Sequence, residues 1–363
     1  MRFTILLLSL LTGVSVASAQ NDLWVHPKCA PCPAAGKAGP FVRLGDGSLL
    51  AVAGNTTLVS ADDGQTWSTP RPIYEGTGAG VPADGCMVRT GKGVLVLVYM
   101  DQVDAKFTFD LNADTLEADL DVWAIRSLDE GKTWVDRQKI LDGYCGAVIN
   151  MIVTRSGHVV IPVQDALRGP VRHGQYVFVS ADDGKAWTRS NLIDLGGRGD
   201  HDGGFEATVA ELTDGALWML LRTNLDRFWS AYSDDHGYHW RRWEPSSIEA
   251  STSPGFLLRL ASGRLLLLWN QLYPEGLDEA AKTQYPRRHA PWQAEVDPSW
   301  HRDELSLAFS NDDGRTWTAP IVVVRWKDGN LAYPYAFEVQ PGQVWIEANG
   351  VRRAIREADF LAP

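Results

Sequence analysis

The octapeptide SADDGQTW, from Ser60 to Trp67, decides the fold because four further copies of its pattern follow in the chain. All copies have serine at the first position, aspartate at the third, glycine at the fifth and tryptophan at the eighth. Their first residues lie 67, 53, 53 and 77 residues apart, a period typical of propellers and solenoids. The other copies are SLDEGKTW (Ser127–Trp134), SADDGKAW (Ser180–Trp187), SDDHGYHW (Ser233–Trp240) and SNDDGRTW (Ser310–Trp317).

The residues that the copies share suit the turn of a β-hairpin. An aspartate side chain accepts backbone N–H groups within a turn, and glycine adopts a positive φ without steric cost. The tryptophan is expected to pack between neighbouring sheets and to hold the turn on its own sheet. We therefore interpret all five copies as structural turns and assign no catalysis to them.

A second repeat precedes most of these turns. It is a β-hairpin in which apolar residues flank a polar turn that contains glycine. Six such hairpins, each joined to a second one, predict an all-β six-bladed β-propeller of four-stranded antiparallel blades. The insertions 101–121 and 271–301 are expected to be loops over one face. The six hairpins are FVRLGDGSLLAV (41–52), MVRTGKGVLVLV (87–98), MIVTRSGHVVIPV (151–163), TVAELTDGALWMLL (208–221), FLLRLASGRLLLLW (256–269) and AFEVQPGQVWIEA (336–348).

Residues 1–19 have the features of a signal peptide. Arg2 gives a positive start, residues 5–11 are mostly apolar, and Ala17-Ser18-Ala19 offers a small-residue cleavage site. Residues 20–363 are then expected to form one propeller domain that is secreted or periplasmic. The formal net charge of −11 argues against binding to nucleic acid or anionic membranes, so an anionic substrate would need a local basic pocket.

No metal or cofactor is predicted. Cys29 and Cys32 form a C-x-x-C pair without the second half of a zinc site, so we expect a local disulfide or free thiols. The two remaining cysteines leave three full pairings open. The run from Asp110 to Asp121 has calcium-loop spacing, but Thr115 stands where such a loop requires glycine. The chain is expected to be a monomer.

The six hairpins can be aligned on their turn glycines. Nine residues before the glycine, at the start of the first strand, stand Asp84 and Glu206 in the second and fourth hairpins and Tyr333 in the sixth. First strands line the central channel of a propeller, so these two acids and the phenol are expected to meet at its mouth. Seven residues after the glycine, Arg222 is the charged outlier at the end of its strand.

Each of these residues also has a purely structural interpretation. Tyr333 could be a core tyrosine with a bonded hydroxyl, and Asp84 could be a turn residue in PADG. Arg222 could brace its blade with its apolar stem. Lys37, in the loop-like AAGKAGP, could simply be solvated.

At these residues the chain resembles the sialidase superfamily, also called the BNR or Asp-box propellers. The resemblance extends over nearly all of residues 20–363. The family places a glutamate at the start of a blade and an arginine at the end of the next strand, like Glu206 and Arg222 in FEATVAELTDGALWMLLR. Its last active-site arginine precedes a strand that leads into an Asp box, like Arg302 in RDELSLAFSNDDGRTW. Its nucleophilic tyrosine opens the final blade, like Tyr333 in LAYPYAFEVQPG.

Two positions depart from the family pattern. Lys37 replaces the first of three arginines that grip a carboxylate, and lysine cannot form the two-pronged pair of a guanidinium with a carboxylate. The family's catalytic aspartate after the first hairpin is missing, because residues 49–55 lead almost straight into the Asp box. Asp84 is the candidate that replaces it. His201 and Asp202, just before Glu206, are further candidates for substrate binding.

The resemblance implies a retaining, exo-acting glycoside hydrolase for a terminal anionic sugar of a glycan or glycoconjugate. A non-catalytic glycan-binding propeller, a lyase or a different glycosidase also fits the sequence, because a propeller does not fix chemistry. The implied roles are nucleophile for Tyr333, its base for Glu206, acid for Asp84, and binding of the anionic group for Arg222, Arg302 and Lys37.

Overall fold

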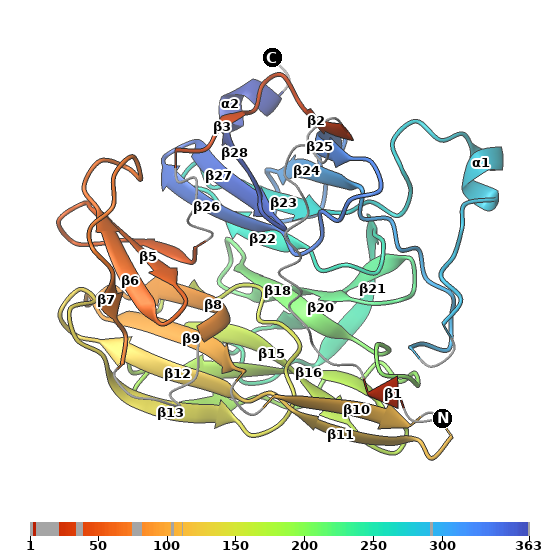
Figure 1. The fold of residues 1–363 in the computed structure, drawn as a ribbon, viewed down its shortest axis with the longest axis horizontal. Coiled ribbons are helices and arrows are strands. Elements are labelled where there is room, and N and C mark those ends of the chain that lie inside the picture. Colours follow the sequence, from red (N-terminus) through yellow and green to blue (C-terminus); the bar gives the residue numbers. More distant parts are fainter. Residues whose placement is uncertain are drawn as a thin grey trace.

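The structure is a computed structural model that describes residues 3–4, 22–33, 39–74, 82–102, 105–110, 112–290 and 293–361, with the backbone alone at 3–4 and 82–84. Six antiparallel sheets stand in a ring around a central channel (Figure 1). Strands make up nearly all of the regular structure. The prediction of an all-β, six-bladed propeller is therefore confirmed.

Blades 1 to 3 each contain four strands in chain order, with the first strand at the channel. Blade 1 contains β4 (Phe41–Arg43), β5 (Leu49–Ala53), β6 (Thr56–Ser60) and β7 (Arg71–Pro72). Blade 2 contains β8 (Pro82–Arg89), β9 (Leu95–Asp101), β12 (Val122–Ser127) and β13 (Val135–Leu141). Blade 3 contains β14 (Ile152–Val153), β15 (Val159–Leu167), β16 (Arg172–Ser180) and β17 (Thr188–Arg189).

Blades 4 to 6 repeat the same arrangement. Blade 4 contains β18 (Phe205–Glu211), β19 (Leu217–Arg222), β20 (Arg227–Ser233) and β21 (Arg242–Glu249). Blade 5 contains β22 (Phe256–Arg259), β23 (Leu265–Trp269), β24 (Glu304–Ser310) and β25 (Ile321–Trp326). Blade 6 contains β26 (Tyr335–Gln340), β27 (Gln343–Ala348) and β28 (Val351–Arg356) from the C-terminal end of the chain.

The N-terminal segment closes the ring. β3 (Ala30–Pro31) is the fourth strand of blade 6 and pairs antiparallel with β28, so that Ala30 lies opposite Ala354. β2 (Leu23–Val25) pairs with β25 and adds a fifth strand to blade 5. The last blade is thus built from both ends of the chain, which leaves fewer sheet edges unpaired.

The first Asp box shows why its sequence makes a tight turn. The Ser60 hydroxyl accepts the N–H of Gly64 at 2.8 Å, and Oδ1 of Asp62 accepts the N–H of Thr66 at 2.8 Å. The Trp67 indole donates to the carbonyl oxygen of Gly64 at 3.1 Å. One serine and one aspartate therefore satisfy the backbone of the whole turn, as the sequence predicts.

The glycine of the box lets one blade approach the preceding one closely. A Cβ atom on Gly131 would lie 2.3 Å from Cδ1 of Leu50 in blade 1. A Cβ atom on Gly314 would lie 2.5 Å from the ring of Trp218 in blade 4. Any larger residue at these positions would push neighbouring blades apart.

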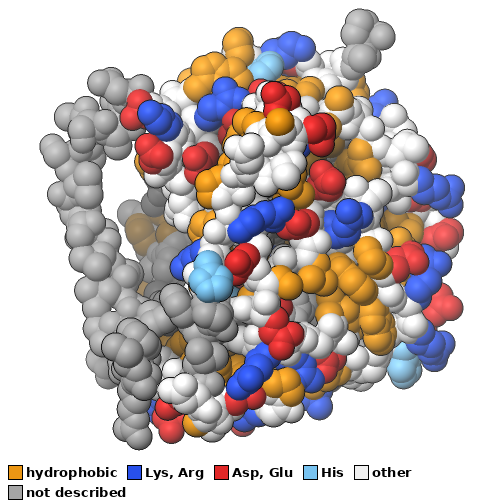
Figure 2. Space-filling view, turned by 90° about the vertical axis from the view of Figure 1, so that its right-hand side faces the viewer, with side chains coloured by type: hydrophobic (Ala, Val, Ile, Leu, Met, Phe, Trp, Pro, Cys, Tyr) orange, Lys and Arg blue, Asp and Glu red, His pale blue; other side chains and the backbone are white. Residues whose placement is uncertain are grey.

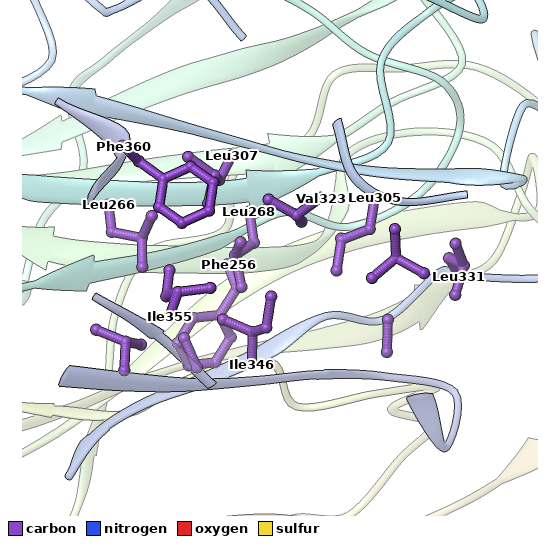
Figure 3. Close-up of a cluster of buried hydrophobic side chains, with 14 of the residues drawn as sticks. Phe256, Leu266, Leu268, Leu305, Leu307, Val323, Leu331, Ile346, Ile355 and Phe360 are labelled. Atoms are coloured by element: carbon purple, nitrogen blue, oxygen red, sulfur yellow. The ribbon is translucent and has the colours of Figure 1, made fainter. Parts of the chain in front are cut away.

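The core consists of apolar layers between adjacent blades. Figure 3 shows the layer between blades 5 and 6, where Leu266, Leu268 and Leu307 of blade 5 face Ile346 and Ile355 of blade 6. Alternate residues of these strands share a face, so the alternating apolar pattern of each hairpin is what fills the layer.

The insertion 101–121 differs from the sequence prediction. It was expected to be a loop, but β10 (Lys106–Asp110) and β11 (Thr115–Asp119) form a hairpin within it, and β1 (Phe3–Thr4) pairs with β10. Phe109 and Leu116 pack against Ala166 and Val171 of blade 3, which gives the hairpin a small core of its own. This packing against blade 3 supplies the support that an isolated two-stranded hairpin lacks.

The insertion 271–301 contains one short helix, α1 (Glu279–Thr283), and α2 (Glu357–Phe360) ends the described chain. No helix within the described ranges is long and apolar enough to cross a bilayer. No disulfide joins the four cysteines, which all lie within the described ranges. Figure 2 shows a face of the molecule on which acidic and basic side chains are interspersed.

Candidate active site

Tyr333 and Glu206 meet at the end of the channel where the first strands begin. Glu206 lies in β18, and Tyr333 lies just before β26. The Tyr333 hydroxyl donates a hydrogen bond of 2.9 Å to Oε1 of Glu206. The two residues are 127 positions apart in the chain, so the ring of blades is what brings them together.

Both residues have an unusual backbone. The φ angle is +46° at Glu206 and +57° at Tyr333, in the left-handed region that residues other than glycine seldom adopt. The pairing of β18 with β19 shifts between Phe205 and Thr208, which marks a bulge at Glu206. A bulge beside a site turns a side chain in a new direction. Strained backbone of this kind clusters at functional sites, where the surrounding structure maintains it.

Asp84 occupies the equivalent place in blade 2. The pairing of β8 with β9 shifts between Ala83 and Cys86, so the register is also irregular across Asp84. The next residue, Gly85, lines the same cavity as Tyr333. The carboxyl group of Asp84 lies outside the described part of the structure, as does the whole of Lys37, and the roles of both stay predictions.

Arg222, the last residue of β19, is buried and contacts both partners. Its Nη1 donates to Oε2 of Glu206 at 2.5 Å and to the Tyr333 hydroxyl at 3.3 Å. Its Nε donates to Oγ1 of Thr252 at 3.2 Å, and its guanidinium lies 4.6 Å from the ring centroid of Phe205. One carboxylate oxygen of Glu206 is thus held by a cation and the other by the phenol.

The charges decide which group carries the proton. Burial alone would raise the pKa of Glu206, but the charge of Arg222 and the hydrogen bonds from Arg222 and Tyr333 outweigh it, and this pKa lies below its ordinary value. Burial and the Glu206 carboxylate raise the pKa of Tyr333 to about 12. At neutral pH, Glu206 is therefore a carboxylate and Tyr333 a neutral phenol.

Arg302 lies beside this pair, and no carboxylate within the described ranges forms an ion pair with it. It is buried, its Nη2 donates to the carbonyl oxygen of Thr252 at 2.6 Å, and its Nε has no hydrogen-bond partner among the described residues. Its guanidinium lies 3.9 Å from the ring centroid of Trp300 and 5.9 Å from that of Tyr333. Burial and the charge of Arg222 lower the pKa of Arg302 to about 9. A buried cation without a counter-ion favours an incoming anion.

A cavity of about 800 Å³ opens beside Tyr333 and is formed mainly by blades 6, 1 and 3. Tyr333 is 42% exposed, so a ligand in this cavity can reach its ring. Arg352, on β28, also lines the cavity, and its Nε is buried with no hydrogen-bond partner. The volume is that of a small-molecule site.

The other end of the channel has arginines too, but acids neutralise them. A hollow of about 690 Å³ at that end is lined mostly by the apolar first strands. The arginines around it form ion pairs with acidic partners, in most cases Asp-box residues. These pairs are Arg43–Asp63, Arg89–Glu130, Arg155–Glu211 and Arg259–Asp313. Among the described residues, the guanidinium of Arg302, which has no acidic partner, therefore distinguishes the end that holds Tyr333.

Asp202 is engaged within the protein. It is buried, and its carboxylate accepts the backbone N–H groups of Arg198, Gly203 and Glu295 at 3.1, 2.8 and 3.1 Å. These bonds fasten the loop before β18 to the 271–301 insertion. Asp202 therefore shapes the rim of the site, and both of its carboxylate oxygens already have partners.

His201 lies on the same loop and is linked to Arg222 by hydrogen bonds. Its Nδ1 lies 3.0 Å from Oδ1 of the buried Asp200, and its side chain is partly exposed. Its carbonyl oxygen accepts from Nδ2 of Asn224 at 2.7 Å. Oδ1 of Asn224 accepts from the Thr252 hydroxyl at 2.6 Å, and this hydroxyl accepts from Arg222.

Three supporting residues were not among those predicted from the sequence. Oε1 of Gln164 accepts the backbone N–H of Glu206 at 3.0 Å, Thr252 bonds both active-site arginines, and Trp300 stacks on Arg302. Gln164 stands seven residues after its turn glycine, the position of Arg222 in blade 4, so the internal alignment contained a signal for it. Thr252 and Trp300 stand in irregular segments to which no repeat points.

Comparison with known proteins places the chain in a family. The model of the BNR repeat-like domain matches residues 58–346. No curated protein sequence matches the chain. A solved structure of a protein of unknown function from Dyadobacter fermentans is similar with a TM-score of 0.60 and 18% identity, over 93% of this chain and 100% of the other.

Two sialidases are also similar in structure. NanB sialidase from Streptococcus pneumoniae has a TM-score of 0.58 and 12% identity, over 88% of this chain and 68% of the other. Trypanosoma rangeli sialidase, solved as a covalent intermediate with 2,3-difluorosialic acid, has a TM-score of 0.55 and 17% identity. The likeness covers 88% of this chain and 54% of the Trypanosoma rangeli protein, so this chain spans about half the length of that protein. At these identities the likeness establishes a shared fold.

Proposed function

The chain belongs to the BNR repeat-like domain family, and on this premise we propose that it is a sialidase-like glycoside hydrolase that removes a terminal anionic sugar from a glycan. The observation that carries the proposal is the contact of Tyr333 with the buried Glu206 and Arg222, with Arg302 beside it. These groups supply a nucleophile, its base and a cation for an anionic group. The shared fold with sialidases supports the same reaction class.

Tyr333 is proposed to be the nucleophile and Glu206 its base. A phenol with a pKa of about 12 is a poor nucleophile until its proton is removed, and Glu206 stands 2.9 Å away to accept it. A neutral nucleophile suits a sugar with a carboxylate at its anomeric carbon, because an anionic nucleophile would be repelled. Arg222 keeps Glu206 ionised and ready to accept the proton.

The leaving oxygen needs a proton as the glycosidic bond breaks. We assign this proton to Asp84, whose irregular register and cavity-lining neighbour Gly85 support a place at the channel mouth. The phenol oxygen then carries the sugar. Water attacks the anomeric carbon and gives a proton to the Asp84 carboxylate, the bond from that carbon to the phenol oxygen breaks, and Glu206 returns its proton to Tyr333. Two displacements at one carbon give retention of configuration.

The anionic group of the sugar is proposed to lie against Arg302 and Arg222, as the free Nε of Arg302 suggests. Lys37 remains a proposed partner. Arg352 is a further candidate, because it lines the same cavity with an unpartnered Nε. His201 is proposed to contact the sugar from the rim, on the loop that Asp202 anchors.

A panel of 4-methylumbelliferyl glycosides of sialic, glucuronic and galacturonic acids tests the assignment. The wild type should cleave at least one of them. Tyr333→Phe and Glu206→Gln should each lower kcat by about 10²- to 10⁴-fold, because each removes one partner of the proton transfer. Asp84→Asn should slow cleavage of a methyl glycoside more than of the aryl glycoside, whose leaving group needs no proton. Fluorescence release measures the rates for the aryl glycosides. ¹H NMR measures the rate for the methyl glycoside and identifies the anomer of the first product.

Tyr176→Phe is the matched control, because this tyrosine lies on β16 and its ring is stacked by Arg189. It should retain wild-type rates. Full activity of Tyr333→Phe would refute the nucleophile. Binding of glycans without turnover, unchanged by the Tyr333 and Glu206 variants, would indicate a glycan-binding propeller instead.

A further inference from the structure

Arg302 shares its stacking partner with a second arginine, Arg288. The guanidinium carbon of Arg288 lies 4.0 Å from the ring centroid of Trp300, and that of Arg302 lies 3.9 Å from the same centroid. The two cations are therefore within about 8 Å of each other. The indole holds both by cation–π contact while they repel each other.

Neither cation is neutralised by the described part of the chain. No carboxylate there forms an ion pair or a hydrogen bond with Arg288 or Arg302. The neighbouring Arg287 behaves differently, since its guanidinium bonds both carboxylate oxygens of Asp226 and the Tyr273 hydroxyl. In a chain with a net charge of −11, two adjacent cations without an acid form a local site for anions.

The segment that carries Arg288 is fastened to the candidate active site. The N–H of Arg288 donates to the carbonyl oxygen of Pro298 at 3.0 Å, and the N–H of Thr252 donates to that of Ser299 at 3.0 Å. The N–H of Leu331, two residues before Tyr333, donates to the carbonyl oxygen of Arg302 at 2.6 Å. The backbone therefore holds Arg288 at a set distance from the nucleophile.

We propose that Arg288 and Arg302 form a two-point site for a substrate with two anionic groups. The inner group lies on the sugar to be released, at Arg302, and the outer group lies on the adjoining unit, at Arg288. A separation of up to about 8 Å is one that a sugar ring can span. The inference rests on the proposed function and narrows its substrate class to glycans that carry acidic groups on successive units.

A pair of simple carboxylates tests the site without knowledge of the sugar. Glutarate has two carboxylates on a flexible chain, and butyrate has one on a chain of similar length. Wild-type protein at low ionic strength should bind glutarate more tightly than butyrate. Arg288→Gln should weaken glutarate binding by about threefold to fivefold, because one partly exposed ion pair contributes about this much to affinity. The same substitution should leave butyrate binding unchanged. Isothermal titration calorimetry measures both dissociation constants.

Arg242→Gln is the matched control. Arg242 also stacks on an aromatic ring, 3.9 Å from the centroid of Tyr232, but it lies on the outer strand of blade 4. It should bind both probes like the wild type. Arg288→Gln with unchanged glutarate binding, or with equal loss for both probes, would overturn the two-point site alone. Wild-type protein that binds neither probe would overturn the anion site at Arg302, and with it the proposed function.

Discussion

A buried arginine without a counter-ion is expensive for a protein to keep, and within the described part of the chain no carboxylate forms an ion pair with Arg302. Burial and the nearby Arg222 disfavour its charged form, which is why its pKa falls to about 9. Thr252 and Trp300 hold its guanidinium but supply no negative charge. A ligand anion would remove this cost, and the free energy gained in this way would add to the affinity for the anion.

The pKa of Arg302 leads to a pH dependence of binding. Its lowered pKa means that the group is charged below about pH 9 and neutral above it. Affinity for butyrate should therefore be level near neutral pH and fall by up to about tenfold per pH unit above about pH 9. Calorimetric titrations at constant ionic strength measure this profile.

Arg302→Gln is the control for this profile, because glutamine does not titrate. Its affinity should be weaker than that of the wild type and the same at every pH in this range. A wild-type affinity that stays constant up to about pH 10 would contradict the lowered pKa of Arg302, and an Arg302→Gln affinity equal to that of the wild type would show that Arg302 does not bind the anion.

At the scale of elements, the Asp box sets the spacing between blades. Its glycine has a positive φ and also faces the core of the preceding blade, so it meets two demands at once. Gly314 has a φ of +80°, and a Cβ atom at this position would lie 2.5 Å from the ring of Trp218. Gly215, in the inner hairpin of blade 4, has a φ of +94° but open space around it.

Alanine substitutions at these two glycines distinguish the cost of left-handed backbone from the cost of a clash with the neighbouring blade. Gly314→Ala should lower the free energy of unfolding by about 2–4 kcal/mol, because it adds a clash with Trp218 to the cost of left-handed backbone. Gly215→Ala should lower it by only about 1–2 kcal/mol, since the backbone cost acts alone. Urea unfolding followed by tryptophan fluorescence measures both values. Equal losses in the two variants would contradict a spacing role for the box.

The elements that could be predicted from the sequence are those that repeat. Five boxes and six hairpins specified the blades, since each turn depends on a few local residues such as Ser60, Asp62 and Gly64. The same alignment listed Glu206 and Tyr333 at one blade position, and the structure joins them by a hydrogen bond. The hairpin at 101–121 has no second copy, and its order depends on packing against blade 3, which periodicity alone does not reveal.

At the scale of the whole molecule, the ring depends on a strand that the sequence did not reveal. β3 has two residues, Ala30 and Pro31, too few for any periodic pattern to show. Its pairing with β28 is a contact between the two ends of the chain. Thr252 and Trp300 lie in irregular segments. Tertiary contacts decide where such segments lie, so the sequence pattern did not reveal these residues either.

Removal of residues 22–33 tests how much the closing segment contributes. A chain that begins at residue 34 lacks β2 and β3, so blade 6 loses its fourth strand and blade 5 its fifth. Its melting temperature should fall by at least about 5 °C relative to a chain that begins at residue 22. Differential scanning calorimetry measures the difference. Equal melting temperatures would mean that the ring is stable with three strands in its last blade.

The pairing of Ala30 with Ala354 has a consequence for biosynthesis. Blade 6 needs β3, which precedes blade 1 in the chain, and β28, which follows blade 5, so its sheet cannot be completed before β28 has been synthesised. Until then, the growing protein carries an open edge at its sixth sheet, where unpaired backbone invites association with other chains. The closed ring, which joins Tyr333 of blade 6 to Glu206 of blade 4, is therefore a state that the chain reaches only after residue 356 has been translated.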